Sequence, residues 1–363
     1  MSQDLRIEWC PSSRLPALQS FIDKNWAAGH VLAKDADLFR WQHPHLESAA
    51  RLSMLTAVDN EQIVGLLGVI PVGISVYGER VPGGFLAMWF ALPEYRNRQA
   101  GLALLNAAHS HCQVVGVLGF NSQVHITFKA MRYEIWPELP RFVSVISDTR
   151  MALMFRESGN GWHLTPLRHK RVSPKPPDHI MEWDESFVER WDSFWDEFSR
   201  GIVGTWRDWK YLRHRYARHP RYRYKLLFAE NPKTHQLEGL AVYRLEPVGA
   251  TGQSVMRIVE FLADLNAGER LADALIARAH QHEVAFADFF CTSEIFANPL
   301  VAAGFYRESE DSGHLPCLFQ PLEPRYRPLN AAIRFPSGSP IRSGSDVYFT
   351  KSDGDQDRPN LLQ

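Results

Sequence analysis

The sequence predicts an α/β protein that consists of two tandem copies of one unit. The length of 363 residues is sufficient for two domains. Three landmarks also recur in the same order: a segment that ends in His-Pro, a strand that follows a hairpin turn, and a corner between a helix and a strand. These landmarks lie 176, 174 and 172 residues apart, at Pro44 and Pro220, Gly65 and Gly239, and Tyr133 and Phe305. A nearly constant offset of this kind indicates a duplicated structural unit.

The pattern of apolar residues predicts the elements of the first copy. Apolar residues at positions 15, 18, 21, 22 and 26 follow helical spacing. Apolar runs separated by turn residues at 59–60 and 77–79 predict a three-stranded meander. The expected elements are a strand at 7–10, a helix at 15–26, strands at 52–58, 63–76 and 85–92, a helix at 101–112, a strand at 114–120 and a helix at 122–131.

The second copy repeats this plan. Phe187, Trp191, Phe194 and Phe198 lie on one face of an acidic helix, which predicts that they belong to the core. Strands at 224–229, 239–245 and 255–265, a helix at 269–282 and a strand at 285–290 follow. We expect an N-terminal unit over 1–165, a basic, proline-rich linker over 166–182 and a C-terminal unit over 183–363. Each unit is expected to be a mixed, mostly antiparallel sheet flanked by helices.

Composition excludes several classes of function. With 40 Lys and Arg against 41 Asp and Glu, the net charge of −1 argues against a protein that binds nucleic acid or membranes through its overall charge. The four cysteines show neither CxxC pairs nor zinc spacing, which is typical of a reducing compartment. No apolar run reaches ~20 residues, and the first residues do not resemble a signal peptide. We therefore expect a cytoplasmic protein without membrane insertion.

The segment from Phe85 to Leu105 is the most informative part of the chain. An apolar strand leads into a basic turn, and the turn opens directly onto a helix. The first N–H groups of a helix are unpaired and lie at the positive end of its dipole, so such a turn can bind phosphate. Arg96 and Arg98 add positive charge, and Gly101 allows close approach to the backbone. The alternative is an ordinary surface turn with solvated arginines.

The residues Pro93-Glu-Tyr-Arg-Asn-Arg-Gln-Ala-Gly101 resemble, without a gap, the Pro-Glu-Tyr-Arg-Gly-Arg-Gly-x-Gly loop of the GNAT superfamily of acyl-CoA-dependent N-acyltransferases. Asn121 and the segment 128–133 fall where this family has an asparagine and a Tyr-x-x-x-Gly-Phe corner. The resemblance is strong over 50–135 and extends to the second copy only in outline. It implies two tandem GNAT-like units, acyl-CoA as a co-substrate and no metal.

The resemblance also implies which residues bind CoA. The pyrophosphate would lie on the N–H groups of the helix start, and the pantetheine arm would follow the strand edge and meet the asparagine. The residues implied are Phe90, Ala91, Leu92, Arg96, Arg98, Gln99, Ala100, Gly101, Leu102, Ala103 and Asn121. Two positions depart from the family pattern: Gln99 replaces a loop glycine, and Phe128 replaces the tyrosine that protonates the leaving thiolate in many members. The second copy lacks the basic loop at 265–271, so one CoA site is expected.

Direct acyl transfer to an amine requires a neutral amine, a donor to the oxyanion and a leaving thiolate. We expect the oxyanion donor to be a backbone N–H near Phe90 or Ala91. The strand 85–92 carries no carboxylate, so the candidate bases are His125, Glu260 and Asp264. A water relay or an amine that is already neutral is equally compatible with the sequence.

Two segments bear on the acceptor. Residues 206–224 combine six arginines with two tryptophans and four tyrosines, which predicts either a helix with buried aromatic rings and solvated arginines or a local site for a diphosphate. The tail at 346–359 contains Asp353-x-Asp355-x-Asp357 but no calcium-binding loop, and a frayed acidic terminus is one interpretation of it.

The tail also resembles that of tandem GNAT proteins from bacterial surface-polysaccharide clusters, which include nucleotide-sugar N-acyltransferases. This resemblance implies transfer to the amino group of a nucleotide-linked sugar, a dTDP-linked amino-dideoxyhexose for O-antigen or capsule. The residues expected to bind it are Arg141, Arg215, Tyr216 and Asp353, and no nucleic-acid partner is expected. The alternatives are a transferase that uses aminoacyl-tRNA and a degenerate, non-enzymatic GNAT pair that acts as a binding module.

Overall fold

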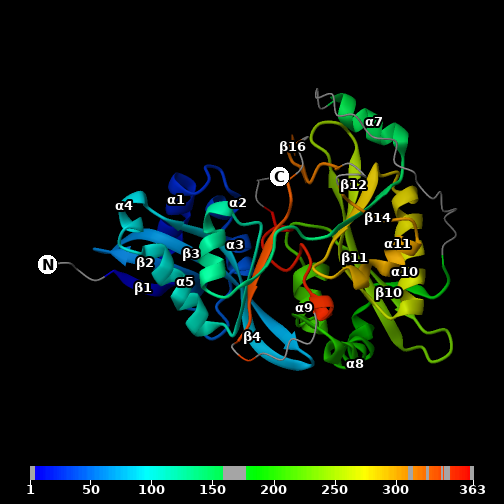
Figure 1. The fold of residues 1–363 in the computed structure, drawn as a ribbon, viewed down its shortest axis with the longest axis horizontal. Helices are drawn as coiled ribbons and strands as arrows, with labels where there is room; N and C mark the ends of the chain where they lie inside the picture. Colours follow the sequence, from blue (N-terminus) through cyan, green and yellow to red (C-terminus); the bar gives the residue numbers. More distant parts are fainter. Residues whose placement is uncertain are drawn as a thin grey trace. The chain divides into compact units, whose positions relative to one another are not determined.

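A computed structural model describes residues 5–157, 177–309, 314–323, 327–336, 338 and 344–359 (Figure 1). The chain divides into two compact units that are not contiguous in sequence. Unit 1 comprises the described residues within 1–136, 330–340 and 352–363, and unit 2 comprises those within 137–329 and 341–351. Within the described ranges, no helix combines the length and the apolar character that crossing a bilayer requires.

Unit 1 contains a mixed sheet with the strand order β1-β2-β3-β4-β5-β17-β6. The first four strands form an antiparallel meander, β5 is parallel to β4, and β17 is antiparallel to both of its neighbours. In chain order the elements are β1 (Arg6–Pro11), α1 (Leu15–Asn25), α2 (Val31–Lys34), α3 (Ala36–Gln42), β2 (Arg51–Asp59), β3 (Gln62–Val76), β4 (Glu79–Ala91), α4 (Pro93–Arg96), α5 (Ala100–His111), β5 (Val114–Leu118), α6 (His125–Ala130), β6 (Glu134–Trp136) and β17 (Ala331–Arg334).

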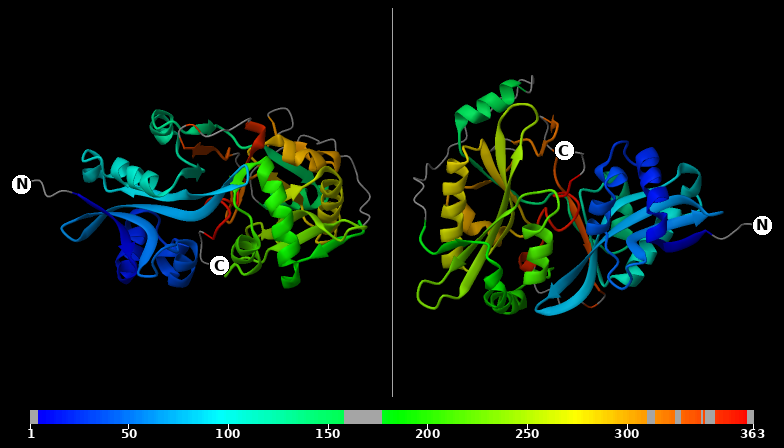
Figure 2. Two further views of the ribbon diagram at one scale, coloured as in Figure 1. Left: turned by 90° about the horizontal axis from the view of Figure 1, so that it is seen from below. Right: turned by 180° about the vertical axis from the view of Figure 1, so that it is seen from behind.

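Helices cover both faces of this sheet, as the left view of Figure 2 shows. Leu104 and Leu105 of α5 pack against alternate strand residues such as Leu67 on one face. Helices α1, α2 and α3 bury a second apolar cluster on the other face, which includes Leu18 and Leu66. Neighbouring residues of one strand, such as Leu66 and Leu67, belong to different clusters because successive side chains of a strand point to opposite faces of the sheet. The sheet is therefore the middle layer of unit 1, and both of its faces are apolar.

Unit 2 repeats this topology with the strand order β14-β7-β13-β12-β11-β10-β8. Strands β8, β10, β11 and β12 are antiparallel, β13 is parallel to β12, and β7 is antiparallel to β13 and β14. Its elements are β7 (Arg141–Val145), α7 (Asp148–Glu157), β8 (Ile180–Glu182), α8 (Val188–Phe198), β9 (Val203–Thr205), α9 (Trp209–Leu212), β10 (Lys225–Glu230), β11 (Leu237–Pro247), β12 (Ser254–Ala263), α10 (Leu265–Gln281), β13 (Phe286–Phe290), α11 (Asn298–Ala302), β14 (Tyr306–Arg307), β15 (Leu318–Phe319), β16 (Leu322–Glu323) and β18 (Val347–Tyr348).

The matching strand orders confirm the predicted fold class of two GNAT-like units, each with a mixed, mostly antiparallel sheet. They also show that the two copies exchange a strand. Strand β17 follows the elements of unit 2 in sequence but lies between β5 and β6, and Figure 1 draws it in orange among the strands of unit 1. Strand β7 follows the elements of unit 1 in sequence but lies between β13 and β14.

The units therefore differ from the predicted ranges 1–165 and 183–363. Unit 1 ends at Trp136 in the first part of the chain and takes two later segments, while unit 2 begins at Pro137. The reason is that hydrogen bonds to a sheet, rather than order along the chain, decide to which unit a strand belongs. Of the predicted linker 166–182, residues 166–176 lie outside the described residues, and Ile180–Glu182 pairs with β10 as an edge strand.

The aromatic face of α8 is part of the core, as predicted. Trp191 is fully buried, and Phe187, Phe194 and Phe198 pack against the same cluster. The ring of Trp191 lies 5.1 Å from that of Phe194 and 5.6 Å from that of Phe228 on β10. The helix is thus fixed to the sheet of unit 2 by its aromatic side.

The strand exchange predicts that a substitution late in the sequence destabilises the sheet of unit 1. Ile333 on β17 has no exposed surface and lies opposite Gly116 of β5. Ile333→Ala should lower the free energy of unfolding by about 2–5 kcal/mol, because it removes buried methylene groups and leaves a cavity. Urea unfolding measures this loss.

The matched control is Ile126→Ala on α6, because 79% of the Ile126 surface is exposed. This variant should change stability by less than about 0.5 kcal/mol. Equal stability of the Ile333→Ala protein and the wild type would contradict the assignment of β17 to the sheet of unit 1.

Candidate active site

The site begins with an extra residue in β4. Leu66 of β3 lies opposite Phe90, whereas Gly68, two residues further on, lies opposite Ala87, three residues earlier. Met88 within this interval has a positive φ of 51°. The irregularity is a β-bulge, which inserts one residue into a strand and bends it locally.

Gly68 is required beneath the bulge. A Cβ atom at this position would lie 2.8 Å from the Ala87 carbonyl oxygen and 3.0 Å from Cε1 of the buried His43. The first distance is too short for a Cβ atom and involves backbone that cannot easily move, and the second is a tight contact. The absence of a side chain at position 68 therefore allows β4 to depart from regular pairing at this point.

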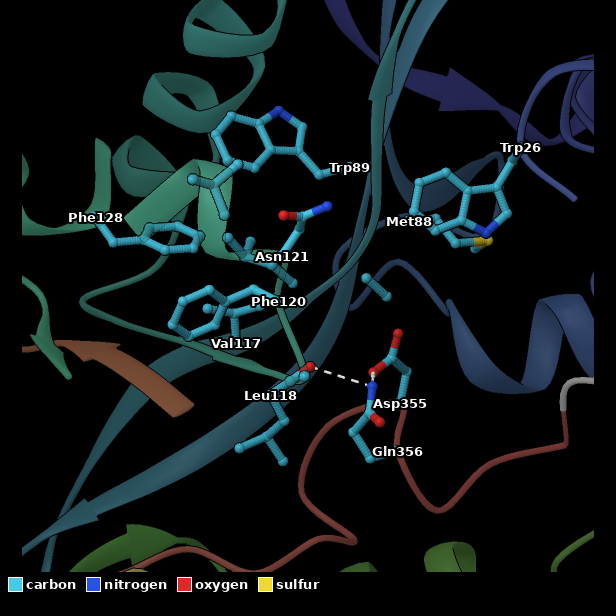
Figure 3. Close-up of a pocket in the computed structure, with 14 residues that line it drawn as sticks. Trp26, Met88, Trp89, Val117, Leu118, Phe120, Asn121, Phe128, Asp355 and Gln356 are labelled. Carbon is cyan, nitrogen blue, oxygen red and sulfur yellow. Dashed lines mark hydrogen bonds between the residues drawn. The ribbon is translucent and has the colours of Figure 1, made fainter. Parts of the chain in front are cut away.

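Strands β4 and β5 separate where the bulge begins. Their parallel pairing runs from Gly83 and Val114 to Leu86 and Val117 and then ends. A cavity of about 370 Å³ occupies the split (Figure 3). Its lining residues are Trp26, Leu86, Ala87, Met88, Trp89, Val117, Leu118, Gly119, Phe120, Asn121, Val124, Phe128, Asp355 and Gln356. The size and the mostly apolar lining with a few polar groups are typical of small-molecule sites.

Aromatic side chains form much of the wall. The ring of Phe128 lies 5.1 Å from that of Phe120 and 5.8 Å from that of Trp89. Trp89 Nε1 donates a hydrogen bond to the Gly101 carbonyl oxygen at 3.0 Å. Trp89 therefore connects the cavity to the first turn of α5. Asn121 also lines the cavity, and its Oδ1 accepts a hydrogen bond from the Gln123 N–H.

Two residues of the C-terminal tail complete the cavity, and sequence analysis did not assign them to it. Gln356 Nε2 donates to the Leu118 carbonyl oxygen at 3.2 Å and to Asp355 Oδ1 at 2.9 Å. Gly119 adopts a φ of 70°, and a Cβ there would lie 2.5 Å from Nε2 of Gln356. Arg358 lies 5.3 Å over the Trp41 ring. The tail is therefore folded onto unit 1 over residues 352–359 and is not a frayed terminus there.

The helix start predicted to bind phosphate has the expected backbone form. Gln99 precedes α5 in the left-handed conformation, with φ 59° and ψ 26°, which explains why glycine is the family's residue here. Its N–H donates to the Arg96 carbonyl oxygen, and its own carbonyl oxygen accepts from the Ala103 N–H. Helix geometry leaves the N–H groups of Ala100, Gly101 and Leu102 without partners inside the helix.

The two loop arginines have different surroundings. Arg98 Nη1 lies 2.7 Å from Asp59 Oδ2, and its guanidinium lies 5.1 Å over the Tyr95 ring. The hydrogen bond from Arg98 holds the pKa of Asp59 below its ordinary value, and the Tyr95 hydroxyl donates to the same carboxylate. Arg96 is exposed, and its Nε donates to the Ala91 carbonyl oxygen. Both arginines are exposed, but Arg98 is paired with the Asp59 carboxylate, whereas Arg96 bonds to a backbone carbonyl oxygen.

The strand residues expected to accompany CoA lie beside the cavity rather than in its lining. The Phe90 ring packs against Phe21 and Trp26 at 6.1 and 6.3 Å. The Leu92 N–H donates to the Val64 carbonyl oxygen. The part of β4 that lines the split is therefore the segment from Leu86 to Trp89, which contains the bulge, and not Phe90 or Ala91.

In unit 2 the corresponding split is filled by the chain itself. Strand β12 also carries an extra residue, because Val242 lies opposite Glu260 and Tyr243 lies opposite Ile258. The pairing of β12 with β13 ends at Ile258. Beyond it, Thr350 pairs with Cys291 and donates from Oγ1 to the Val259 carbonyl oxygen at 2.8 Å. The segment that contains β18 therefore fills the place in unit 2 that corresponds to the cavity of unit 1.

The structure does not place any of the three candidate bases in the cavity lining. His125 is exposed at the start of α6. Glu260 is fully buried in unit 2, where it accepts hydrogen bonds from Arg207, Tyr216 and Tyr348. Asp264 caps α10 by accepting a hydrogen bond from the Ala267 N–H. Glu260 and Asp264 therefore have structural partners that account for their presence.

The residues expected to bind the acceptor are buried instead of lining a surface. Arg141 pairs with Asp288 at 2.6 Å and with Glu308 at 3.1 Å, and all three side chains are buried. Arg215 is buried against the rings of Tyr216 and Tyr224. These contacts differ from the predicted solvent-facing anion site, because the aromatic rings and the paired carboxylates surround the guanidinium groups.

Asp353 is buried as well and precedes the lining residue Asp355 by two positions. The acceptor-binding role of Asp353 stays a prediction, and the aspartate of this segment that lines the cavity is Asp355. Within the described residues, no group of three His, Cys, Asp or Glu side chains is placed to hold a metal ion.

The sequence of the candidate site is similar to a known protein family. Residues 25–124 match the model of the acetyltransferase (GNAT) domain. This match covers 100 of the 363 residues. The matched residues include the bulge, the strands of the split, the loop and α5, so the similarity covers most of the candidate site in unit 1. No curated protein matches the sequence.

Solved structures resemble nearly the whole chain. A GCN5-related N-acetyltransferase from Kribbella flavida is 13% identical with a TM-score of 0.55, covering 92% of this chain and 71% of that one. One from Anabaena variabilis is 14% identical with a TM-score of 0.55, covering 92% and 73%. The N-myristoyltransferase of Saccharomyces cerevisiae with bound myristoyl-CoA is 10% identical with a TM-score of 0.50, covering 100% and 92%. At these identities the likeness shows the fold.

The bulge predicts a specific sensitivity at position 68. Gly68→Ala should reduce the free energy of unfolding by about 1–3 kcal/mol, because the new methyl group overlaps the Ala87 carbonyl oxygen. Gly201→Ala serves as the control, since no atom lies within 4 Å of a Cβ at that position. Chemical denaturation compares the two variants. A Gly68→Ala protein as stable as the control would show that the bulge does not depend on this glycine.

Proposed function

We propose that this protein is an N-acyltransferase that moves an acyl group from acyl-CoA to a primary amine. The observation that carries the proposal is the cavity in the split between β4 and β5, joined through Trp89 to the open start of α5. A thioester with a long phosphorylated arm needs both an apolar channel and an anion site. Unit 1 offers these two features on adjoining elements.

The residues of unit 1 fit the parts of acyl-CoA. The N–H groups of residues 100–102, with Arg96, would bind the pyrophosphate. The strand edges exposed by the split would pair with the amides of the pantetheine arm, and Asn121 could donate to it from Nδ2. A backbone N–H at Met88 or Trp89 would stabilise the oxyanion, because bulged residues have left the regular ladder.

For the acceptor, we propose the amino group of a nucleotide-linked amino sugar, such as a dTDP-linked amino-dideoxyhexose for O-antigen or capsule. The support is the resemblance of the tail to nucleotide-sugar N-acyltransferases, together with the position of Asp355 and Gln356 in the cavity lining. Arg141 and Arg215 cannot provide the diphosphate site, because both are buried in unit 2. Other cations would therefore bind the diphosphate.

The first test is binding of CoA. At 100 times its dissociation constant, CoA should stabilise the protein by about 2.7 kcal/mol in a thermal-shift experiment. Arg96→Ala should weaken binding about tenfold, since it removes a charged hydrogen-bond donor from the anion site. Arg40→Ala, which removes an exposed arginine of the same unit, should bind CoA normally. No shift at millimolar CoA would contradict the proposed function.

The second test distinguishes the acceptors. A thermal shift with dTDP, added after CoA, is expected for a nucleotide-sugar acceptor, and tRNA fragments should give none. The reverse result would favour a transferase that uses aminoacyl-tRNA. Binding of CoA with no acyl transfer to any dTDP-linked amino sugar or other primary amine would favour a non-enzymatic binding module.

A further inference from the structure

The cavity contains a single ionisable side chain. Of the fourteen residues that line it, only Asp355 carries a group that titrates. The neighbouring wall segments, 86–89 and 117–121, have apolar or amide side chains, as do Trp26, Val124 and Phe128. A carboxylate in such surroundings has no structural partner of opposite charge in the lining itself.

The Asp355 side chain is held in place by hydrogen bonds. Gln356 donates to Asp355 Oδ1 at 2.9 Å and to the Leu118 carbonyl oxygen at 3.2 Å, as the dashed lines in Figure 3 show. The Gln356 amide thus joins the carboxylate to the last residue of β5. That residue lies where β5 has already separated from β4. The carboxylate is therefore fixed at the split, in the same cavity that the bulge residues Ala87, Met88 and Trp89 line.

The environment of Asp355 is suited to accepting a proton. Burial raises its pKa above the ordinary value of an aspartate, whereas Gln356 and the charge of Arg358 act in the opposite direction. The tail segment also carries Asp353 and Asp357, whose side chains are both buried. A base with a raised pKa is a stronger proton acceptor, and its side chain is only half-buried, so a ligand in the cavity can reach it.

We propose that Asp355 is the proton acceptor for acyl transfer and that the cavity selects an acceptor with a positively charged primary amine. This inference rests on the proposed function. A carboxylate as the sole charged group in an apolar cavity attracts an ammonium group and repels carboxylates and phosphates from the reacting centre. The phosphates of a nucleotide-linked acceptor would accordingly lie outside this cavity.

The proton balance requires one group that acts twice. The ammonium group of the acceptor gives one proton to Asp355 and becomes a neutral amine. Its lone pair attacks the thioester carbonyl, the C–N bond forms and the oxygen takes the π electrons. When the carbonyl re-forms, the C–S bond breaks and its electrons remain on sulfur. Asp355 then returns its proton to the thiolate. The nitrogen still carries one excess proton, and Asp355 accepts this proton and releases it to solvent.

Phe128 makes this second role necessary. Its ring is 1% exposed and has no hydroxyl group, so it cannot protonate the thiolate. The resemblance to the GNAT family places a tyrosine acid at this position in other members. With Asp355 at the split, the same carboxyl group can supply the proton, and no second acid is needed among the lining residues.

The experiment compares wild type with Asp355→Asn and with Asp37→Asn, a control whose carboxylate is fully exposed on unit 1. CoA affinity is measured first and should be equal in all three. Acetyl transfer from acetyl-CoA to a panel of dTDP-amino sugars and simple primary amines is then followed by thiol release across pH. Asp355→Asn should lose about 10²–10⁴-fold in kcat/KM, and the loss should shrink above the pKa of the amine.

A second measurement, the pKa of the thiol of bound CoA, requires no acceptor. The thiol of bound CoA is titrated by thiolate absorbance. In wild type the neighbouring carboxylate should hold the pKa of this thiol higher than in Asp355→Asn, with Asp37→Asn equal to wild type. Unchanged thiol titration and unchanged kcat/KM in Asp355→Asn, with normal CoA binding, would overturn the assignment of Asp355. Failure of wild type to bind CoA would overturn the proposed function instead.

Discussion

One extra residue in β4, between the pairs Gly68–Ala87 and Leu66–Phe90, separates β4 from β5, and the rest of the site depends on that separation. Without it, β4 and β5 would continue their parallel pairing beyond Leu86 and Val117. Their backbone N–H and C=O groups would then form hydrogen bonds within the sheet and would not be available to a ligand. With it, the two strand ends diverge and enclose a cavity of about 370 Å³. The open start of α5 is tied to this cavity by the hydrogen bond of Trp89. A local backbone irregularity thus provides both polar edges and apolar walls.

In unit 2 the same irregularity is present, but the split beside it is filled by another part of the chain. Strand β12 has its own extra residue, but Tyr348 and Thr350 bond to Glu260, Phe261 and Val259 across the split. The chain then continues into unit 1, where Asp355 and Gln356 line the cavity. One C-terminal segment therefore fills the split of one copy and completes that of the other. This difference explains how two copies with the same strand order differ at the split, where unit 1 has a cavity and unit 2 has β18 and Thr350.

Much of the fold follows from local patterns. The helices at 15–25 and 100–111 and the meander strands were predictable because apolar periodicity and turn residues act within a short window. The strand exchange was not, because nothing in the sequence of Ala331–Arg334 specifies β5 and not β13 as its partner. The same limit applies to Arg141 and Arg215: their sequence context shows charge but not the buried carboxylates and rings that surround them.

For the site, the sequence located the loop and α5 through the family resemblance, and the left-handed Gln99 accounts for its one departure there. The strand residues that line the cavity are 86–89 and not the expected 90–92. A bulge leaves no periodic signal in a continuously apolar strand. Asp355 was visible only as part of an acidic tail. Its proximity to Leu118, 237 residues earlier, depends on the fold of the whole chain, although the three alternating aspartates marked the correct segment.

The most direct test is a crystal structure of the protein with a non-reactive acyl-CoA analogue. We expect one bound analogue per chain. Its pyrophosphate should lie on the N–H groups of residues 100–102, and its pantetheine arm should lie between β4 and β5. Its thioester position should lie between the bulge at 87–89 and the Asp355 carboxylate. An analogue bound between β12 and β13, or bound in unit 1 away from the split, would contradict this expectation.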